Sequence, residues 1–369
     1  MIKRLLPTLL TVLLLAALFA GCSGGTPQTE TSSAAATQET TQTQAPVEQS
    51  ADTSATAAAD DITIGFVQID LTNTFHIGEV EGAKECARRY GFNIEVTSGD
   101  GDVTKQVEAF DNLIEKGVDA IAVNPIDVTA YTNSFEKAKA KGIPVIIEHS
   151  SSDYATCEVG FDEFSLSSEV GEYAVKLLTD KYGSAKGNVA ILAGMLGQGL
   201  NQGRTGGFIS VMDKNPDIKI VAAEPTDWDG TKATTIMENY LTTYPDIDLL
   251  YGLSDSVTYP AANVIMNANK RDQIFITSVD GMDYALKAIQ DGEMDSTYLL
   301  GSQYTGYWKC FITYQAATGK LTEKKHIING CIVTKDNVDT VVKMVDDMKN
   351  NIQTFQFERE LLDILKGYK

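Results

Sequence analysis

The stretch ITIGFVQIDLTNTFHIGEVEGAKECARRY, residues 62–90, decides the fold of this chain. Its first apolar residues, Ile62, Ile64 and Phe66, alternate with other residues, which predicts a β-strand. After a polar loop, apolar residues recur at every third or fourth position, which predicts a helix with one buried face. Such a unit is the first half of a βαβ motif, and ligands bind where the loops leave the carboxyl ends of the strands. We therefore expect the loop at residues 70–76, which carries an amide, an aromatic ring and an imidazole, to form part of a binding surface.

The same pattern of strand and helix repeats along the chain. Continuous apolar runs predict buried parallel strands, and apolar positions at helical spacing follow them. Glycine residues end the first predicted helices, at Gly91, Gly117 and Gly142. The series starts again near Ser165, so we predict an α/β protein with two lobes, each built on its own doubly wound parallel sheet. The later strands are predicted at residues 93–96, 119–124, 143–148, 188–194, 218–223, 248–253, 273–279 and 296–300.

A Gly-rich segment at residues 197–207 begins like the dinucleotide-binding motif G-x-G-x-x-G, but Gln202 stands at the third glycine position. We therefore expect a flexible loop between the lobes that leads into a helix near Phe208, and no dinucleotide. The apolar spacing in residues 338–369 predicts two amphipathic helices packed on the body.

The amino terminus has the anatomy of a secretory signal. Lys3 and Arg4 precede an apolar run that is short for a bilayer span, which takes about 20 residues. The run LFAGC, which ends at Cys22, resembles a bacterial lipobox and implies that Cys22 is lipidated; a plain signal peptide with an incidental cysteine is the alternative. Residues 22–60 are rich in Thr, Ser, Ala and Gln, which predicts a flexible tether. We expect a protein held on the extracytoplasmic face of the cell membrane by its lipid.

Charge and cysteine content exclude several classes of protein. The formal net charge of −20 repels phosphate backbones, so nucleic acid is not an expected partner. An even number of further cysteines permits disulfides, but one of them falls on a predicted buried helix face and no C-x-x-C motif occurs. We expect most of them to be small core residues. They are Cys86, Cys157, Cys310 and Cys331.

The motifs of common enzymes are missing from the chain. It holds three histidines, His76, His149 and His326, and no G-x-S-x-G elbow, H-E-x-x-H motif or P-loop. We therefore predict a binding protein that is not an enzyme and that needs neither a cofactor nor a metal.

Polar and aromatic residues recur at the predicted strand ends of both halves. If both sheets aim these ends at one cleft, the cleft suits a sugar, because rings stack on its C–H faces and charged groups bind its hydroxyls. Alternatives exist for single residues: Arg204 and Asp280 could form an interlobe ion pair, and Trp228 could be a core residue. Three aspartates could instead be helix caps, namely Asp127, Asp255 and Asp283. The residues at strand ends are Asn73, Phe75, His76, Asn124, Asp127, Glu148, His149, Arg204, Trp228, Ser254, Asp255 and Asp280.

Six stretches occur in order along the body of the chain, namely DLTNTF at 70–75, DAIAVNPID at 119–127, GIPVI at 142–146, RTGGF at 204–208, TDWD at 226–229 and SVDG at 278–281. Through these stretches, the body from about residue 61 to residue 334 resembles the periplasmic sugar-binding proteins of the ribose-binding type, which are the solute receptors of ABC importers. This resemblance implies two Rossmann-like lobes joined by a three-crossing hinge, with a ligand cleft between them.

The resemblance also implies roles for single residues. Asn73 would bind the sugar and Phe75 would stack on it. Arg204 would donate to its hydroxyls and Asp280 would accept from two of them. Trp228 takes the place of a stacking phenylalanine in the family.

Four contacts depart from the ribose-binding pattern, so the resemblance implies a carbohydrate but not ribose itself. His149-Ser150 replaces an Asp-Arg pair, Ser254 replaces an asparagine, and His76 replaces the second of two adjacent phenylalanines. The glutamine near the second hinge crossing falls at Leu300, with Gln303 nearby. The predicted ligand-binding residues are Asn73, Phe75, His76, His149, Arg204, Trp228, Ser254, Asp280 and Gln303.

We expect a monomer that captures a sugar or sugar-like polyol by cleft closure and delivers it to an ABC-type membrane permease. The alternative is a sensory receptor that uses the same lobes to signal to a histidine kinase or chemoreceptor. A transcriptional regulator would need a basic helix-turn-helix where this chain has a lipobox and a tether. The predicted parts are a signal peptide at 1–21, the tether at 22–60, an N-terminal lobe at 61–162 plus about 301–330, a C-terminal lobe at 163–300 plus about 331–336, and a helical tail at 337–369.

Overall fold

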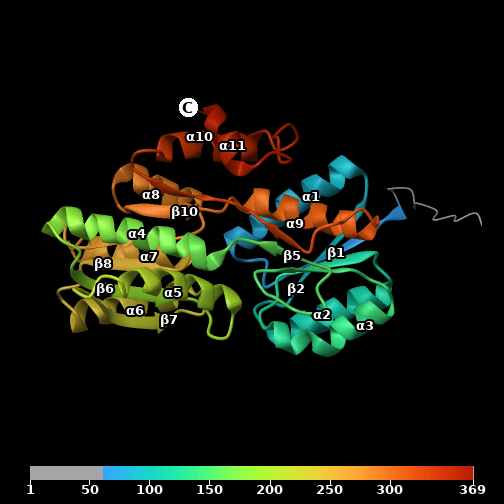
Figure 1. The fold of residues 1–369 in the computed structure, drawn as a ribbon, viewed down its shortest axis with the longest axis horizontal. Coiled ribbons are helices and arrows are strands. Elements are labelled where there is room, and N and C mark those ends of the chain that lie inside the picture. The colour runs from blue at the N-terminus through green and yellow to red at the C-terminus, as the bar shows by residue number, and fades with distance from the viewer. Residues whose placement is uncertain (1–60, 369) are drawn as a thin grey trace, which may run out of the picture. The chain divides into compact units, whose positions relative to one another are not determined.

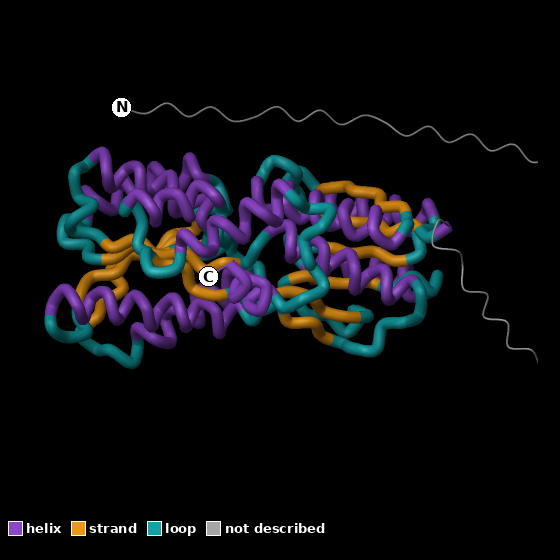
Figure 2. Tube along the Cα trace, turned by 90° about the horizontal axis from the view of Figure 1, so that it is seen from above, coloured by secondary structure: helices purple, strands orange, loops and turns teal. Residues whose placement is uncertain are grey.

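A computed structural model describes residues 61–368 of the chain. The predicted signal peptide, the predicted lipidation site Cys22 and the predicted tether lie outside the described residues. Within them the chain forms an α/β structure with two six-stranded sheets (Figure 1). In Figure 2 the strands of each sheet lie between layers of helices, as expected for doubly wound sheets. None of the helices in residues 61–368 is long and apolar enough to cross a membrane.

The first sheet is entirely parallel, and its strand order is β11-β5-β4-β3-β1-β2. Because β1 pairs with both β2 and β3, the loop that follows β1 leaves the interior of the sheet at its topological switch point. The strands are β1 (Thr63–Gln68), β2 (Asn93–Ser98), β3 (Ala120–Val123), β4 (Val145–Glu148), β5 (Cys157–Gly160) and β11 (Lys325–Ile327). The helices of this lobe are α1 (Thr74–Tyr90), α2 (Val103–Lys116), η2 (Val128–Tyr131), α3 (Thr132–Ala140) and α9 (Ser302–Ala317).

The second sheet repeats this order as β12-β10-β9-β8-β6-β7, with β6 at the switch point. Its edge strand β12 is antiparallel to β10, whereas the other pairs are parallel. The strands are β6 (Gly187–Ala193), β7 (Ile218–Pro225), β8 (Leu249–Gly252), β9 (Phe275–Thr277), β10 (Ser296–Leu299) and β12 (Cys331–Thr334). The helices are α4 (Glu163–Tyr182), α5 (Gly199–Met212), α6 (Gly230–Thr243), α7 (Asp255–Asn267) and α8 (Asp283–Asp291).

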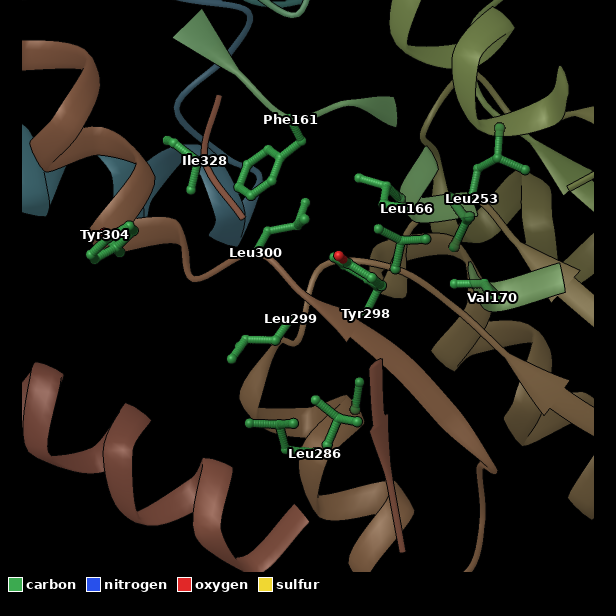
Figure 3. Close-up of a cluster of buried hydrophobic side chains, with 14 of the residues drawn as sticks. Phe161, Leu166, Val170, Leu253, Leu286, Tyr298, Leu299, Leu300, Tyr304 and Ile328 are labelled. Carbon is green, nitrogen blue, oxygen red and sulfur yellow. The ribbon is translucent and has the colours of Figure 1, made fainter. Parts of the chain in front are cut away.

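The chain passes between the two sheets three times, after β5, after β10 and after β11, which confirms the expected hinge. Each crossing carries one buried apolar residue, namely Phe161, Leu300 and Ile328. Figure 3 shows these side chains in one hydrophobic cluster with residues of both lobes. Apolar burial at the crossings therefore holds the three hinge segments together.

The carboxyl-terminal tail contacts both lobes. Its helix α10 packs on α8 of the second lobe, while Phe357 stacks on Tyr307 of α9 with ring centroids 4.5 Å apart. Arg89, in the last turn of α1, donates to the carbonyl oxygens of Ile352 and Phe355 at 2.9 and 2.7 Å. The tail helices are α10 (Val338–Asn350), the short α11 (Leu361–Leu365) and η3 (Lys366–Tyr368).

The Gly-rich segment is where the sequence-based prediction of structure was wrong. Residues 199–207 belong to helix α5 and not to a flexible loop. A Cβ at Gly203 would lie 2.7 Å from Cβ of Glu163, and one at Gly207 would lie 2.1 Å from the carbonyl oxygen of Phe164. These glycines therefore serve the close packing of α5 on α4, rather than flexibility. The prediction also missed three short strands, β5, β11 and β12.

The cysteines among residues 61–368 are free thiols. Cys86, Cys157 and Cys310 are buried, and Cys331 is partly buried. Cys86 lies on the buried face of α1, as predicted.

Candidate functional site

A cavity of about 600 Å³ lies where the strand ends of both lobes meet. Loops that follow β1, β2, β3 and β4 of the first sheet line it, together with loops and helices that follow β6, β7, β8 and β9 of the second. Most of the residues predicted to bind a ligand line this cavity, namely Asn73, Phe75, His76, His149, Arg204, Trp228, Ser254 and Asp280.

The ninth predicted residue, Gln303, does not line this cavity. It lies in the first turn of α9, where it lines a separate cavity of about 410 Å³ and donates to the carboxylate of Glu81 at 3.2 Å. Gln303 lies three residues after Leu300 in the sequence. The first turn of α9 directs its side chain away from the main cavity.

Local hydrogen bonds hold the first-lobe side of the cavity. Asn73 is the N-cap of α1, and its Oδ1 accepts from the amide of Phe75 at 2.9 Å. One oxygen of Asp70 accepts from the amides of Thr72 and Asn73, and the other lies 3.1 Å from Nδ1 of His76. Burial acts to raise the pKa of Asp70, but the hydrogen bonds from His76 and Asn73 outweigh it and hold the pKa well below its usual value. Asp70 is therefore a fixed anion that shapes this loop.

The cap leaves one polar group of Asn73 unused. Its amide nitrogen forms no hydrogen bond with any of residues 61–368, while the residue lines the cavity. The neighbouring Phe75 is half-buried at the same wall. An amide donor beside an aromatic face can bind a hydroxyl and stack on a ring at once.

Trp228 forms the aromatic wall on the second-lobe side. Its indole Nε1 donates to Oε1 of Gln198 at 2.7 Å, and a Cβ at Gly194 would lie 2.1 Å from the ring. Gly194 therefore leaves the space that the indole occupies. Asp227 and Trp228 both adopt left-handed backbone angles, with φ of 54° and 62°, which are costly for residues with side chains. Trp228 is half-buried, so it is a wall of the cavity and not a core residue.

A charged cluster lies at the base of the second-lobe side. Nη1 of Arg204 donates to Oδ1 of Asp280 at 3.1 Å and to the carbonyl oxygen of Leu253 at 2.6 Å. The hydroxyl of Ser254 donates to the other oxygen of Asp280. Both ion-pair partners belong to the second lobe, so the predicted pair exists but does not join the lobes.

This cluster leaves hydrogen-bonding capacity for a ligand. Nη2 of Arg204 forms no hydrogen bond within residues 61–368, and Oδ1 of Asp280 accepts only one. Burial lowers the pKa of Arg204, but Glu163 and Asp280 outweigh it and raise the pKa above its usual value. The guanidinium is therefore a permanent donor next to a carboxylate acceptor, which matches two neighbouring hydroxyls.

His149 reaches the cavity from the first lobe. It follows β4 with a left-handed φ of 52° and is buried beside the ring of Phe161. Its Nδ1 lies 2.9 Å from Oε1 of Glu163, the first residue of α4 in the second lobe. No pattern in the sequence marks Glu163 as a site residue, because its role depends on the packing of distant elements.

Two tyrosines of the cavity were also missed. Tyr259 of α7 and Tyr284 of α8 line it with ring centroids 5.2 Å apart. Both lie inside helices, whereas most of the predicted binding residues follow the ends of strands. Of the three aspartates considered as caps, Asp127 is the N-cap of η2, while Asp255 and Asp283 are the first residues of their helices.

The described part of the chain, residues 61–368, contains no group of three or more His, Cys, Asp or Glu side chains suited to a metal ion. The lining of the cavity offers aromatic rings, hydrogen-bond donors and hydrogen-bond acceptors.

Comparison with known proteins agrees with this arrangement. The family model of the periplasmic binding protein domain matches residues 64–321. Ribose import binding protein RbsB of Bacillus subtilis (strain 168) is 30% identical over 237 residues, which cover 64% of this chain and 75% of the relative. By their names, the relatives are binding proteins and not enzymes, in agreement with the prediction.

Solved structures share the fold. An ABC transporter solute-binding protein from Bacillus halodurans C-125, with bound myo-inositol, is 27% identical with a TM-score of 0.72, and the match covers 78% of this chain and 99% of that one. The fructose-binding periplasmic domain of a hybrid two-component system is 24% identical with a TM-score of 0.73, covering 79% and 98%, and this likeness concerns the fold alone. The family model matches most of the chain, and the chain has two doubly wound lobes with a cavity between them. The chain therefore belongs to the periplasmic binding protein domain family.

Proposed function

We propose that this chain binds a sugar or sugar-like polyol in the cavity between its lobes and delivers it to an ABC-type membrane permease. The observation that carries the proposal is the pairing of two aromatic walls from opposite lobes, Phe75 and Trp228, with the donor and acceptor of Arg204 and Asp280. Rings stack on the C–H faces of a sugar, while the ion pair binds its hydroxyls. The names of the relatives and the ligands of the solved neighbours, ribose and myo-inositol among them, support the same class of ligand.

The proposed ligand contacts are the predicted residues that line the cavity; Gln303 is not among them. Because both lobes contribute, a ligand bound in the cavity adds contacts across the hinge and shifts the population toward a closed form. A permease can then distinguish the closed surface from the open one. We further propose that the protein acts as a monomer, anchored through Cys22 on the extracytoplasmic face of the cell membrane.

The first test is thermal unfolding of the purified chain with pentoses, hexoses, cyclitols and nucleosides. A ligand that binds only the folded state stabilises it by about 2.7 kcal/mol at a hundredfold excess over its dissociation constant. One or more sugars or cyclitols should raise the melting temperature clearly. A panel without any stabilising sugar or polyol would contradict the proposal.

Fluorescence can then place the ligand. The chain has two tryptophans, Trp228 in the cavity and Trp308 on α9. In a Trp308→Phe variant, Trp228 is the sole tryptophan, so the stabilising sugar should change its emission. The matched Trp228→Phe variant, which retains Trp308, should show little change. A response from Trp308 alone would place the ligand elsewhere.

The second candidate function is that of a sensory receptor that signals to a histidine kinase or chemoreceptor, since the same fold occurs in a two-component system. The neighbouring genes separate the two functions. Genes for a permease and an ATPase would support transport, and a gene for a histidine kinase would support sensing.

A further inference from the structure

A chain of buried charges runs from the first lobe into the second beside the cavity. Glu148 ends β4, His149 follows it, and Glu163, Arg204 and Asp280 belong to the second lobe. Each of these residues contacts the next one in this order. The first contact joins Nε2 of His149 and Glu148 at 3.5 Å, and the last joins Arg204 and Asp280 at 3.1 Å. The middle member is Glu163, which does not line the cavity although its neighbours on both sides do.

The position of Glu163 allows it to hold two cavity residues at once. Its Oε2 accepts from Nε of Arg204 at 2.7 Å, and its Oε1 lies 2.9 Å from Nδ1 of His149. The absence of a side chain at Gly203 brings α5 this close, because a Cβ there would lie 2.7 Å from Cβ of Glu163. One carboxylate therefore contacts the guanidinium and the imidazole together.

The two contacts differ in geometry. The one to Arg204 is a well-formed hydrogen bond within the second lobe. The one to His149 crosses between the lobes, and its two atoms are close without the alignment of a hydrogen bond. An attraction between charges needs no strict alignment, so this contact persists as an ion pair when the imidazole is protonated.

The contact with Arg204 determines which of its nitrogens meets a ligand. Glu163 occupies Nε, and Asp280 with the carbonyl oxygen of Leu253 occupies Nη1. Nη2 is the nitrogen left for the cavity. Without the carboxylate at Nε, the guanidinium can rotate and present another edge.

We propose that Glu163 is the positioning residue of the ligand cavity, where it orients the guanidinium of Arg204 toward the ligand and holds the first-lobe imidazole of His149 against the second lobe. The inference rests on the proposed function, because it assumes that the ligand contacts Arg204 and His149. Glu163 does not touch the ligand itself, but it determines how Arg204 and His149 face the ligand.

The charges that face His149 come from four elements. Glu148 of β4 and Glu163 of α4 are anions, Arg204 of α5 is a cation, and Lys309 of α9 pairs with Glu148 from the other side. Burial lowers the pKa of His149, but Glu148 and Glu163 outweigh it and raise the pKa above its usual value. A protonated His149 is therefore the form that the two carboxylates favour.

The test is an NMR titration of the three histidines in the ligand-free chain. The variants His76→Gln and His326→Gln assign their signals. Glu163→Gln removes the charge with little change in shape. The titration midpoint of His149 should fall by at least about 1 pH unit, because an opposite charge within 4–6 Å shifts a pKa by about 1–3 units. Glu163→Leu, which also removes the acceptor at Nε, should make the Nε proton of Arg204 exchange faster with solvent than in the wild type.

A conservative variant and a matched pair provide the controls. Glu163→Asp retains the charge and should restore most of the His149 midpoint. Glu323 lies 3.1 Å from Nδ1 of His326 on an outer strand of the first lobe. Glu323→Gln should therefore leave both the His149 midpoint and sugar binding unchanged.

Affinity measurements connect the inference to function. For the sugar that stabilises the wild type most, the dissociation constant of Glu163→Gln should rise about tenfold or more at pH 7, which is about 1.4 kcal/mol. An unchanged His149 midpoint in Glu163→Gln, or unchanged Arg204 exchange in Glu163→Leu, would overturn the inference. If the wild type binds no sugar, the proposed function fails, while the two ligand-free readouts still decide whether Glu163 holds both side chains.

Discussion

The two sides of the cavity are held together in different ways. On the first-lobe side, Asp70 and Asn73 bond to residues two, three or six positions away in the sequence. On the second-lobe side, Arg204 bonds to residues that are 41, 49 and 76 positions away. The first side is thus a local loop on a helix cap, and the second exists only after its lobe has folded.

Because of this difference, the effect of a variant on ligand binding can be separated from its effect on folding stability. A change in the loop affects a few exposed or half-buried hydrogen bonds, which contribute about 0.5–1.5 kcal/mol each. A change in the charged cluster leaves a buried ion without its partner, which is far more costly. Variants of both sides should therefore reduce ligand affinity, but they should reduce the free energy of unfolding by very different amounts.

The largest effect is expected for Arg204→Met. Methionine fills most of the volume but leaves Glu163 and Asp280 buried without their cation. The free energy of unfolding should fall by about 3–5 kcal/mol, measured by urea denaturation, and sugar binding should be lost. Adding Glu163→Gln in the same chain should recover part of that stability, since one uncompensated charge is then removed. If Arg204→Met unfolds like the wild type, the second side is not coupled to the fold.

A smaller effect per pH unit should appear in the pH dependence of stability. Asp255 is buried and accepts from the amide of Met282 and the hydroxyl of Thr297, both at 2.8 Å. Burial and the nearby Asp280 raise the pKa of Asp255 to about 8. The folded state thus favours the protonated acid, whereas the unfolded chain loses the proton near pH 3.9. Stability from this group is present at low pH and is lost as the pH rises through about 4 to 8.

Denaturation of the wild type and Asp255→Asn at several pH values measures this loss. The wild type should lose stability relative to the variant by up to about 1.4 kcal/mol per pH unit between pH 4 and pH 8. Asp272→Asn, an exposed change in the same lobe, should leave the profile parallel to that of the wild type. Parallel profiles for Asp255→Asn would mean that Asp255 titrates as it does in the unfolded chain.

The same contrast explains what could be predicted from the sequence. Strand periodicity and helix-ending glycines such as Gly91 and Gly117 depend on nearby residues, so the α/β class and the two lobes were predictable. The polar residues of the first loop follow a strand directly, and Asn73 and Phe75 do line the cavity. Resemblance to a known family supplied the hinge, which no local pattern indicates.

The remainder depends on contacts between distant elements. Glu163 resembles any acidic residue at a helix start until α4 and α5 are packed together. In the sequence, the glycines of α5 suggest a loop. In the folded lobe they leave room for the close approach of α4. Gln303 lies close in sequence to a hinge position, but the first turn of α9 directs it to a different cavity.

The smallest stability effect, and the sharpest contrast, is expected for Asn73→Ala. This change removes an N-cap, which costs about 1 kcal/mol, together with an amide donor at the cavity. The matched variant is Asp102→Ala, which removes the N-cap of α2, where the side chain accepts from the amide of Lys105 and does not line the cavity. Both variants should lose similar stability in urea denaturation, but only Asn73→Ala should weaken sugar binding, by about fivefold or more for one lost hydrogen bond of about 1 kcal/mol. Equal affinities in the two variants would show that Asn73 only caps its helix, and the loop would then shape the cavity without contacting the ligand through this side chain.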